Sequence, residues 1–306
     1  QGDSRPPVSS ITDAPPANSN QSSVSFSFTS DEPGSTFQCK LDDGGWQACL
    51  SPFASGQLED GAHGFSLRAI DPSGNLETNP SQRAFSIDTQ AKVTTITGGP
   101  SGQVNDPDPS FSFESENPAV TFECRLTDDG AAGSWVACAS PWQAGPLDDG
   151  EYRFEVRGTD GVGNVEDPPQ RMDFQVDTVA PTSSLTAGPA PVGNDPRPAF
   201  GFTADEPGVA FECLLEKTGG DSGGWEACSS PFTRAAALED GDWTFSVRAT
   251  DLAGNAGPAT APLAFRVDTV APESTIDSGP GEHHTSPDAS FSFSANEAGS
   301  RCECRL

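Results

Sequence analysis

The stretch FSFTSDEPGSTFQCKL, residues 26–41, decides the fold because the chain repeats it. Related stretches follow as FSFESENPAVTFECRL (111–126), FGFTADEPGVAFECLL (200–215) and FSFSANEAGSRCECRL (291–306). In each stretch the second aromatic position precedes the aligned cysteine by eleven residues, as Phe28 precedes Cys39. A fixed spacing that recurs four times is typical of a tandem array of small domains.

An aspartate marks the start of each repeat, 25 residues before the second Phe of the stretch. These residues are Asp3, Asp88, Asp177 and Asp268. The sequence therefore predicts three complete repeats, at 3–87, 88–176 and 177–267, and the N-terminal part of a fourth at 268–306. We expect the chain to be a segment of a longer array, with further repeats of the same chain as its neighbours.

Short alternations of apolar and polar residues, separated by turn residues, predict strands within each repeat. In the first repeat the predicted strands are Ser25–Phe28, Thr36–Leu41, Phe65–Ala69 and Ala84–Ile87, with turns at Asp31–Gly34 and Asp42–Gly45. No stretch of helical periodicity competes with them. So many strands in about 90 residues favour an all-β fold, a tandem array of Ig-like or fibronectin-III-like sandwiches, over a barrel.

Two cysteines in each complete repeat flank a predicted hairpin whose length varies only at its tip. A leucine follows the first cysteine by two residues, and a tryptophan precedes the second by three, as Leu41 and Trp46 show. Cysteines held across a hairpin suit a disulfide, whereas zinc normally needs four ligands. The predicted bonds are Cys39–Cys49, Cys124–Cys138 and Cys213–Cys228, and they imply an oxidising compartment.

The fourth repeat has two cysteines, Cys302 and Cys304, close together. Cys304 occupies the position of Cys39, so its partner is expected beyond Leu306. Cys302 replaces the aromatic residue found at Phe37. Variation in a terminal repeat and an inter-chain disulfide both explain this extra thiol.

The composition excludes several classes of function. The formal net charge is −29, which repels nucleic acid and anionic lipid. No stretch approaches the roughly 20 apolar residues of a membrane span. The second and third repeats contain no histidine for a catalytic triad, so no enzyme activity is expected.

A second recurring motif predicts a corner where an aromatic residue pins the start of a strand. It reads LEDGAHGF (58–65), LDDGEYRF (147–154) and LEDGDWTF (238–245). His63, Tyr152 and Trp243 hold the aromatic position, which makes a structural role for His63 far better supported than a catalytic one. The pattern supports the usual corner hydrogen bond for Tyr152 alone, because only tyrosine carries the phenol.

The stretch VRATDLAGNAGPATAPLAFRVDTVAPESTI, residues 247–276, resembles the bacterial Ig-like repeats of very large secreted or cell-surface proteins. The stretches 67–89 and 156–181 resemble them too. The features that carry the resemblance are Asp-x-x-Gly-Asn, the Val-Asp-Thr-x-Ala-Pro junction and the Leu-x-Asp-Gly corner. The resemblance implies adhesins, stalks or fibres outside the cell, with no one fixed ligand.

The Asp-x-x-Gly-Asn motif, at 71–75, 160–164 and 251–255, has two explanations. It forms a turn, because Gly and Asn tolerate positive φ and the aspartate caps the turn; Arg68, Arg157 and Arg248 are then placed to pair with that aspartate. Alternatively the acidic residues bind Ca²⁺, which needs six to eight oxygens. The candidate ligands are the junction residues Asp88, Asp177 and Asp268 and the corner residues Asp60, Asp149 and Asp240. No cofactor is otherwise required.

The sequence thus predicts a secreted structural protein of the bacterial cell surface, a repeat segment of an extracellular filament or adhesin stalk. The uncharged strands Val24–Phe28 and Pro109–Phe113 suggest open sheet edges for self-assembly into filaments. The alternative is a calcium-dependent adhesion module that binds a glycan or protein through hairpin tips such as Thr127–Ser134 and Lys217–Gly224.

Overall fold

The computed structural model describes residues 3–220, 223–282 and 287–305. Residues 221–222 of the predicted tip Lys217–Gly224, and Leu306, lie outside the described residues. The chain forms two compact units, Gln1–Asp177 and Thr178–Leu306, and each is described by itself. The second unit begins one residue after Asp177, the predicted start of the third repeat, and the repeat boundaries remain predictions.

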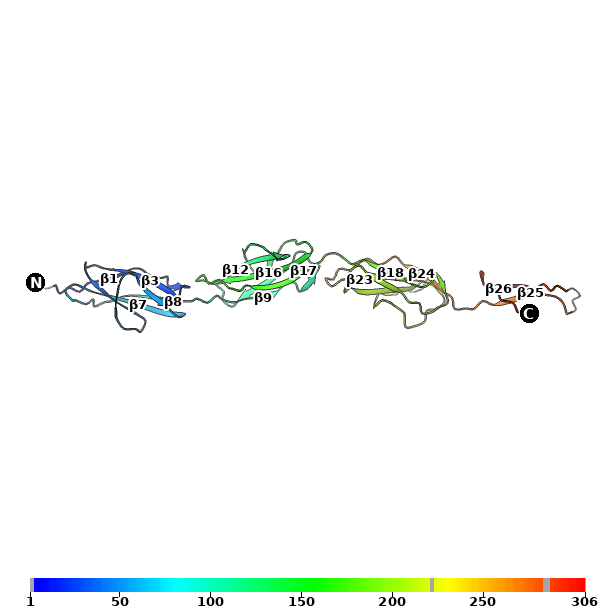
Figure 1. Ribbon diagram of the computed structural model, residues 1–306, viewed down its shortest axis with the longest axis horizontal. Helices are drawn as coiled ribbons and strands as arrows, with labels where there is room; N and C mark the ends of the chain where they lie inside the picture. Colours follow the sequence, from blue (N-terminus) through cyan, green and yellow to red (C-terminus); the bar gives the residue numbers. More distant parts are fainter. Residues whose placement is uncertain (1–2, 221–222, 283–286, 306) are drawn as a thin grey trace. The chain divides into compact units, whose positions relative to one another are not determined.

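All regular elements in the described part of the chain are β-strands, so the predicted fold class is confirmed (Figure 1). No helix there is long and apolar enough to cross a membrane.

The first repeat packs a three-stranded sheet, β1-β3-β6, against a five-stranded sheet, β2-β8-β7-β4-β5. The first sheet comprises β1 (Ser9–Asp13), β3 (Ser23–Ser30) and β6 (Phe53–Gln57). The second comprises β2 (Asn18–Ser19), β4 (Thr36–Leu41), β5 (Gln47–Cys49), β7 (Gly61–Ile70) and β8 (Ser81–Ile87). Strand β3 shows why these residues fold this way, since Val24, Phe26 and Phe28 face inward while Ser23 and Ser25 are exposed.

The second repeat has the same two layers. One sheet comprises β9 (Thr94–Gly98), β11 (Ser110–Ser115) and β15 (Trp142–Gln143) in the order β15-β11-β9. The other comprises β10 (Gly102–Val104), β12 (Thr121–Asp128), β13 (Ala131–Ala132), β14 (Val136–Cys138), β16 (Gly150–Thr159) and β17 (Gln170–Val176). Its order is β10-β17-β16-β12-β13, and β14 also pairs with β12.

The second unit repeats this arrangement and adds a hairpin. Its sheets are β18-β20, β19-β24-β23-β21-β22 and β25-β26. The strands are β18 (Ser183–Ala187), β19 (Val192–Gly193), β20 (Gly201–Ala204), β21 (Ala210–Lys217), β22 (Glu226–Cys228), β23 (Gly241–Thr250), β24 (Leu263–Val267), β25 (Ser274–Ser278) and β26 (Ser292–Ala295).

The predicted open edges are wrong. Strand β3, which contains Val24–Phe28, pairs with β1 on one side and β6 on the other. Strand β11 likewise lies between β9 and β15. The stretches Val24–Phe28 and Pro109–Phe113 are uncharged because their alternating phenylalanines form the buried face of a strand that has a partner on each side.

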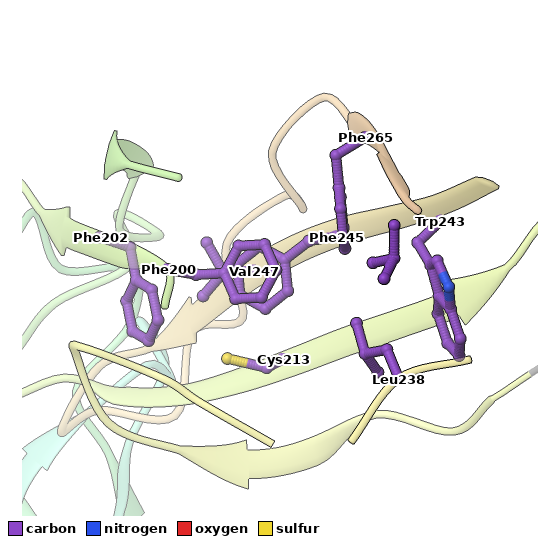
Figure 2. Close-up of a cluster of buried hydrophobic side chains, with 9 residues drawn as sticks. Phe200, Phe202, Cys213, Leu238, Trp243, Phe245, Val247 and Phe265 are labelled. Atoms are coloured by element: carbon purple, nitrogen blue, oxygen red, sulfur yellow. The ribbon is translucent and has the colours of Figure 1, made fainter. Parts of the chain in front are cut away.

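A stacked pair of phenylalanines forms the centre of each core. In the third repeat Phe200 and Phe245 are fully buried, with ring centroids 4.0 Å apart, and Phe202, Val247 and Phe265 pack around them (Figure 2). The same pair recurs as Phe26 and Phe65 at 4.0 Å and as Phe111 and Phe154 at 4.1 Å. Burying each ring stabilises the fold by about 1.5–3 kcal/mol, and stacking adds about 0.5–1.5 kcal/mol per pair.

Each complete repeat has one disulfide in the hairpin that precedes its corner. The bonds are Cys39–Cys49, Cys124–Cys138 and Cys213–Cys228, with Cα–Cα distances of 5.8, 5.8 and 5.9 Å. The bonded cysteines are diagonal neighbours, since Cys39 lies directly opposite Gln47 and Cys49 lies opposite Phe37. The first cysteine of each pair is buried, so the bond fixes the hairpin onto the core.

Glu77 and Glu166 are buried carboxylates that join the two sheets of their repeats, and sequence analysis did not find them. Glu77 accepts hydrogen bonds from the backbone N–H of Ser9, at 3.0 Å, and of Ala69, at 2.9 Å. Ser9 belongs to β1 and Ala69 to β7. Glu166 makes the equivalent bonds in the second repeat.

The described part of the fourth repeat exposes its apolar residues. Phe291 and Phe293 are 45% and 46% exposed, whereas the equivalent Phe200 and Phe202 are buried. Cys302 and Cys304 are free and exposed. No counterpart of β23 covers this face among the described residues.

Candidate functional site

The aromatic corner makes the same hydrogen bond in all three repeats. Tyr152 Oη donates to the carbonyl oxygen of Asp148 at 2.9 Å, and Trp243 Nε1 donates to that of Glu239 at 3.0 Å. His63 Nε2 donates to the carbonyl oxygen of Glu59 at 2.8 Å. The prediction that only Tyr152 supports this bond is therefore wrong, because imidazole and indole N–H groups reach the same carbonyl as a phenol.

The second ring nitrogen of His63 also acts as a donor. Its Nδ1 lies 2.9 Å from Asp42 Oδ2. The hydrogen bond to the Glu59 carbonyl, followed by that to Asp42, raises the pKa of His63, because both bonds require a protonated nitrogen. The corner of the first repeat is thus a structural site that carries a titrating group.

The predicted ligands Asp60 and Asp240 hold the chain where it leaves a repeat. Asp60 Oδ1 accepts hydrogen bonds from the backbone N–H and Oγ1 of Thr89, at 3.0 and 2.9 Å. Asp240 Oδ1 binds Thr269 in the same way, at 3.0 and 2.8 Å. These two carboxylates fix the residue after the junction aspartate.

The other predicted ligands lie at equivalent positions. Asp149 is exposed at the corner of the second repeat. The backbone N–H groups of Asp177 and Asp268 donate to the carbonyl oxygens of Val104 and Gly193 and so continue the last strand of each repeat. The described geometry does not bring Asp60 or Asp240 into an acidic cluster.

The Asp-x-x-Gly-Asn loops form the predicted turns. Asp71 accepts hydrogen bonds from the backbone N–H of Asn75 at 2.7 Å and from its Nδ2 at 2.6 Å. Gly74, before this asparagine, has a φ of 92°, which favours glycine. Burial alone would raise the pKa of Asp71, but the hydrogen bonds from Asn75 and the Ser73 and Gly74 amides outweigh it and lower the pKa.

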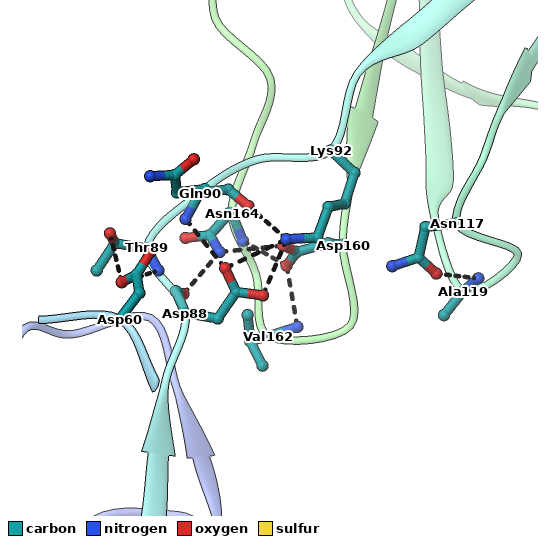
Figure 3. Close-up of polar contacts among 10 residues, drawn as sticks. All are labelled: Asp60, Asp88, Thr89, Gln90, Lys92, Asn117, Ala119, Asp160, Val162 and Asn164. Carbon is teal, nitrogen blue, oxygen red and sulfur yellow. Dashed lines mark hydrogen bonds and ion pairs between the residues drawn. The ribbon is translucent and has the colours of Figure 1, made fainter. Parts of the chain in front are cut away.

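The asparagine of this loop also holds the segment that leads into the repeat. Asn75 Nδ2 donates to the carbonyl oxygen of Asp3 at 2.9 Å, and Asn164 Nδ2 donates to that of Asp88 at 2.8 Å (Figure 3). Asp88 directly follows β8 and its backbone N–H donates to the carbonyl oxygen of Ser19, so the first and second repeats both bind the backbone of Asp88. Sequence analysis missed this contact, although the constant Asn at a position that only needs a turn former was a signal for it.

The junction of the second repeat contains a cation. Lys92 Nζ lies 2.9 Å from Asp88 Oδ2, with Asp160 beside it (Figure 3). The hydrogen bond to Asp88 raises the pKa of Lys92, and the charges of Asp160 and Asp60 contribute in the same direction. Asp88, one of the predicted calcium ligands, is therefore neutralised by a residue of the chain.

The first repeat instead gathers three carboxylates. Oxygens of Asp3, Glu32 and Asp71 lie within 4.8 Å of one another. Burial and the charges of Asp3 and Asp71 raise the pKa of Glu32, because a proton relieves the repulsion. The predicted set included the junction aspartates of later repeats but neither Glu32 nor Asp71.

The predicted Arg–Asp pairs do not form. Arg68 donates to Gln38 Oε1, while Arg157 and Arg248 donate to Glu123 and Glu212. Each of these arginines also stacks over a tryptophan, as Arg68 does over Trp46 at 4.2 Å. The reason is the strand register, which places Gln38 directly opposite Arg68 on the same face of the sheet.

Comparison with known proteins supports the resemblance seen in the sequence. Residues 190–269 match the family model described as bacterial Ig-like domain. No curated protein is significantly similar to the chain.

Several solved structures are similar, all at low identity. The fibronectin(III)-like modules of Clostridium thermocellum CbhA are 17% identical over 57% of this chain and 94% of theirs, with a TM-score of 0.35. A solved chain from a study of a 1.5-MDa bacterial ice-binding adhesin is 17% identical over 87% of this chain and 98% of the solved chain, with a TM-score of 0.43. A tetra-tandem repeat from the extending region of a large adhesion protein is 17% identical over 87% and 74%, with a TM-score of 0.34. Residues 190–269 thus match the bacterial Ig-like domain model, and the strand order and cores repeat along the chain as a series of β-sandwiches.

Proposed function

We propose that this chain is a structural segment of the bacterial cell exterior, a series of disulfide-linked sandwiches that serves as part of an adhesin stalk, without catalysis. The observation that carries the proposal is the bond from Asn164 to the carbonyl of Asp88. It holds Asp88, whose backbone N–H donates to the carbonyl oxygen of Ser19 in the first repeat, against the Asp-x-x-Gly-Asn loop of the second. A spacer requires contacts of this kind, which order the junction between successive repeats.

A location outside the cell is supported by the disulfides. Each complete repeat has one, and such bonds persist in oxidising compartments. The net charge of −29 keeps a long chain soluble. Further repeats of the same chain are the partners that the proposal requires.

Electron microscopy of the native material tests the stalk against a laterally packed filament. Separate rods that are one repeat wide would support the stalk. Bundles that persist at low protein concentration would support self-assembly into filaments instead. Small-angle scattering of the chain adds a second readout, since a spacer should lose its defined maximum dimension when Asn164 is changed to alanine.

A second candidate function, calcium-dependent adhesion, is favoured by the acidic cluster of the first repeat. Asp3, Glu32 and Asp71 offer hard oxygen ligands, and backbone carbonyls and water would complete the six to eight that Ca²⁺ takes. Thermal melts with Ca²⁺ and with chelator test it. A higher melting temperature with Ca²⁺, absent in Glu32→Gln, supports the site, and identical curves for the unmodified chain argue against it.

A further inference from the structure

The outer face of the larger sheet in the second repeat differs from that of its neighbours. Arg153 of β16 lies directly opposite Asp173 of β17. The same paired positions hold Gly64 and Ala84 in the first repeat and Thr244 and Ala264 in the third. The first and third repeats form the same sheet with small uncharged residues at these positions, so the fold does not require the charged pair.

The pair also adds little stability. Arg153 Nε lies 2.6 Å from Asp173 Oδ1, but the two side chains are 43% and 63% exposed. Solvent-exposed ion pairs contribute a median of about 0–1 kcal/mol, so stability does not explain these residues.

A groove of about 540 Å³ lies over this pair. Its sides are the hairpin tip Asp129–Gly130 and the edge strand β10, where Gln103 Nε2 donates to Gln175 Oε1 at 2.8 Å. The tip is fixed to the sheet by the hydrogen bond from Asp129 N to the carbonyl oxygen of Glu151. A volume of this size is within the about 300–1,000 Å³ of small-ligand sites.

The groups that line the groove select for a neutral, hydroxyl-rich ligand. Asp129, Glu151 and Asp173 supply three carboxylates against the one guanidinium of Arg153, so anions are repelled. The guanidinium is already paired, which leaves its remaining N–H groups beside carboxylate acceptors. The amide pair keeps an acceptor, Oε1 of Gln103, together with one N–H of Gln103 and both N–H groups of Gln175. Adjacent donors and acceptors suit sugar hydroxyls, each of which donates and accepts.

We propose that this groove binds a neutral oligosaccharide across Arg153, Asp173 and Gln175. The inference goes beyond the structural role and does not depend on it. It also differs from binding by hairpin tips alone, because the tip forms one side of a site whose base is the sheet.

The test uses the intact chain on an array of neutral oligosaccharides, including cellohexaose, chitohexaose and maltohexaose, with sulfated and uronic-acid sugars and oligolysine as comparisons. Calorimetry then measures the affinity for the best neutral sugar. We expect Arg153→Thr with Asp173→Ala to lower that affinity at least tenfold. The third repeat has threonine and alanine at the equivalent positions, Thr244 and Ala264, so the variant should fold. Circular dichroism checks that it does.

A matched control removes a charged pair from the same face of the third repeat. Asp242→Ala with Arg266→Ala should leave sugar binding unchanged. Gln103→Ala, on the edge strand, should weaken binding without touching the ion pair. The proposal is overturned if no neutral sugar binds at millimolar concentration, if oligolysine binds in place of sugars, or if the exchange of Arg153 and Asp173 leaves the affinity intact.

Discussion

Lys92 Nζ lies 2.9 Å from Asp88 Oδ2, and it occupies the position that Pro7 holds in the first repeat. The first repeat has Glu32 where the second has Asn117. One junction is therefore neutralised by an ammonium group of the chain, while the other gathers three carboxylates.

Giving the second repeat the acidic residue of the first, and removing its lysine, should extend cation binding to the second repeat. We expect Lys92→Ala with Asn117→Glu to give the second repeat a Ca²⁺ response, read as slower hydrogen exchange in residues 158–166 when Ca²⁺ is added. A ligand at 100 times its dissociation constant stabilises by about 2.7 kcal/mol. Lys92→Arg keeps a cation and is the control. Equal exchange with Ca²⁺ and chelator in the double variant would contradict the calcium proposal.

The contact from Asn164 to Asp88 should order the junction without determining global stability. Asn164→Gly keeps a residue that accepts the turn but removes the amide. We expect faster hydrogen exchange at residues 88–93. The loss of stability is about 0.5–1.5 kcal/mol for the neutral bond to Asp88, and at most about 1.5–3 kcal/mol more for the bond that the same amide donates to the Asp160 carboxylate. Asn117→Ala is the control, because Asn117 bonds to the Ala119 amide. If hydrogen exchange at residues 88–93 is unchanged in Asn164→Gly, the bond from Asn164 to Asp88 does not order the junction.

The corner of the first repeat should make that repeat sensitive to pH. The pKa of His63 is raised, so its contribution is complete below about 6.5 and is lost as pH rises through the folded value. The pKa of Asp42 is lowered, because the bonds from His63 and Gly64 outweigh the effect of burial; its contribution is present above about 3.9 and is lost as pH falls through the folded value.

An NMR titration of the imidazole measures this effect directly. We expect a His63 pKa above the ordinary value, and a lower one in Asp42→Asn. His63→Tyr keeps the corner bond and should remove the pH dependence between about pH 6 and 8. A His63 that titrates at or below about 6.5 would be inconsistent with two donated hydrogen bonds.

We expect the buried carboxylate of Glu77 to make a large contribution to the stability of the first repeat. Glu77→Ala leaves two buried backbone N–H groups without an acceptor, each at a cost of about 1–3 kcal/mol. Chemical denaturation should show a loss of roughly 2–6 kcal/mol in the first repeat by this arithmetic. Glu166→Ala should have the same effect on the second repeat, while Glu114→Ala, on an exposed position of β11, should change little. A loss below about 1 kcal/mol would show that water replaces the carboxylate.

The disulfides should each stabilise one hairpin. Peptide mapping without reductant should recover Cys39–Cys49, Cys124–Cys138 and Cys213–Cys228. The bonds close loops with separations of 10, 14 and 15 residues, and each is expected to contribute about 3 kcal/mol. Reduction should therefore lower the melting temperature of all three repeats together. A bond between two complete repeats would contradict the hairpin assignment.

The strands could be predicted because their determinants are local. Thr36–Leu41 coincides with β4, and the Ser/Phe alternation identified the buried face of β3. The order of strands in a sheet is not local. Alternation shows that one face is buried and says nothing of which strands lie on either side, so the central strands β3 and β11 were taken for edges.

The contacts at the junction could be predicted only in part. The turn of Asp71 follows from its own loop, whereas the contact from Asn164 to Asp88 joins residues 76 positions apart. The burial of Glu77 was not predictable from its type, since carboxylates are mostly exposed and its two N–H partners lie on different sheets. The corner bonds of His63 and Trp243 were missed because only the phenol was considered as a donor.

The near-identical stacks of Phe26 on Phe65 and Phe111 on Phe154 have a consequence during folding. A strand from one repeat could therefore stack its phenylalanine on the equivalent ring of another repeat. Such exchange of strands between domains is a characteristic failure of repeat proteins. Bonds between cysteines 10 to 15 residues apart join positions that meet within one hairpin. Such a chain, delivered to an oxidising space from one end, can close each hairpin before the competing strands of the next repeat arrive. For a chain exported as the proposed function requires, the order of export would then select the correct partner among copies that the cores alone do not distinguish.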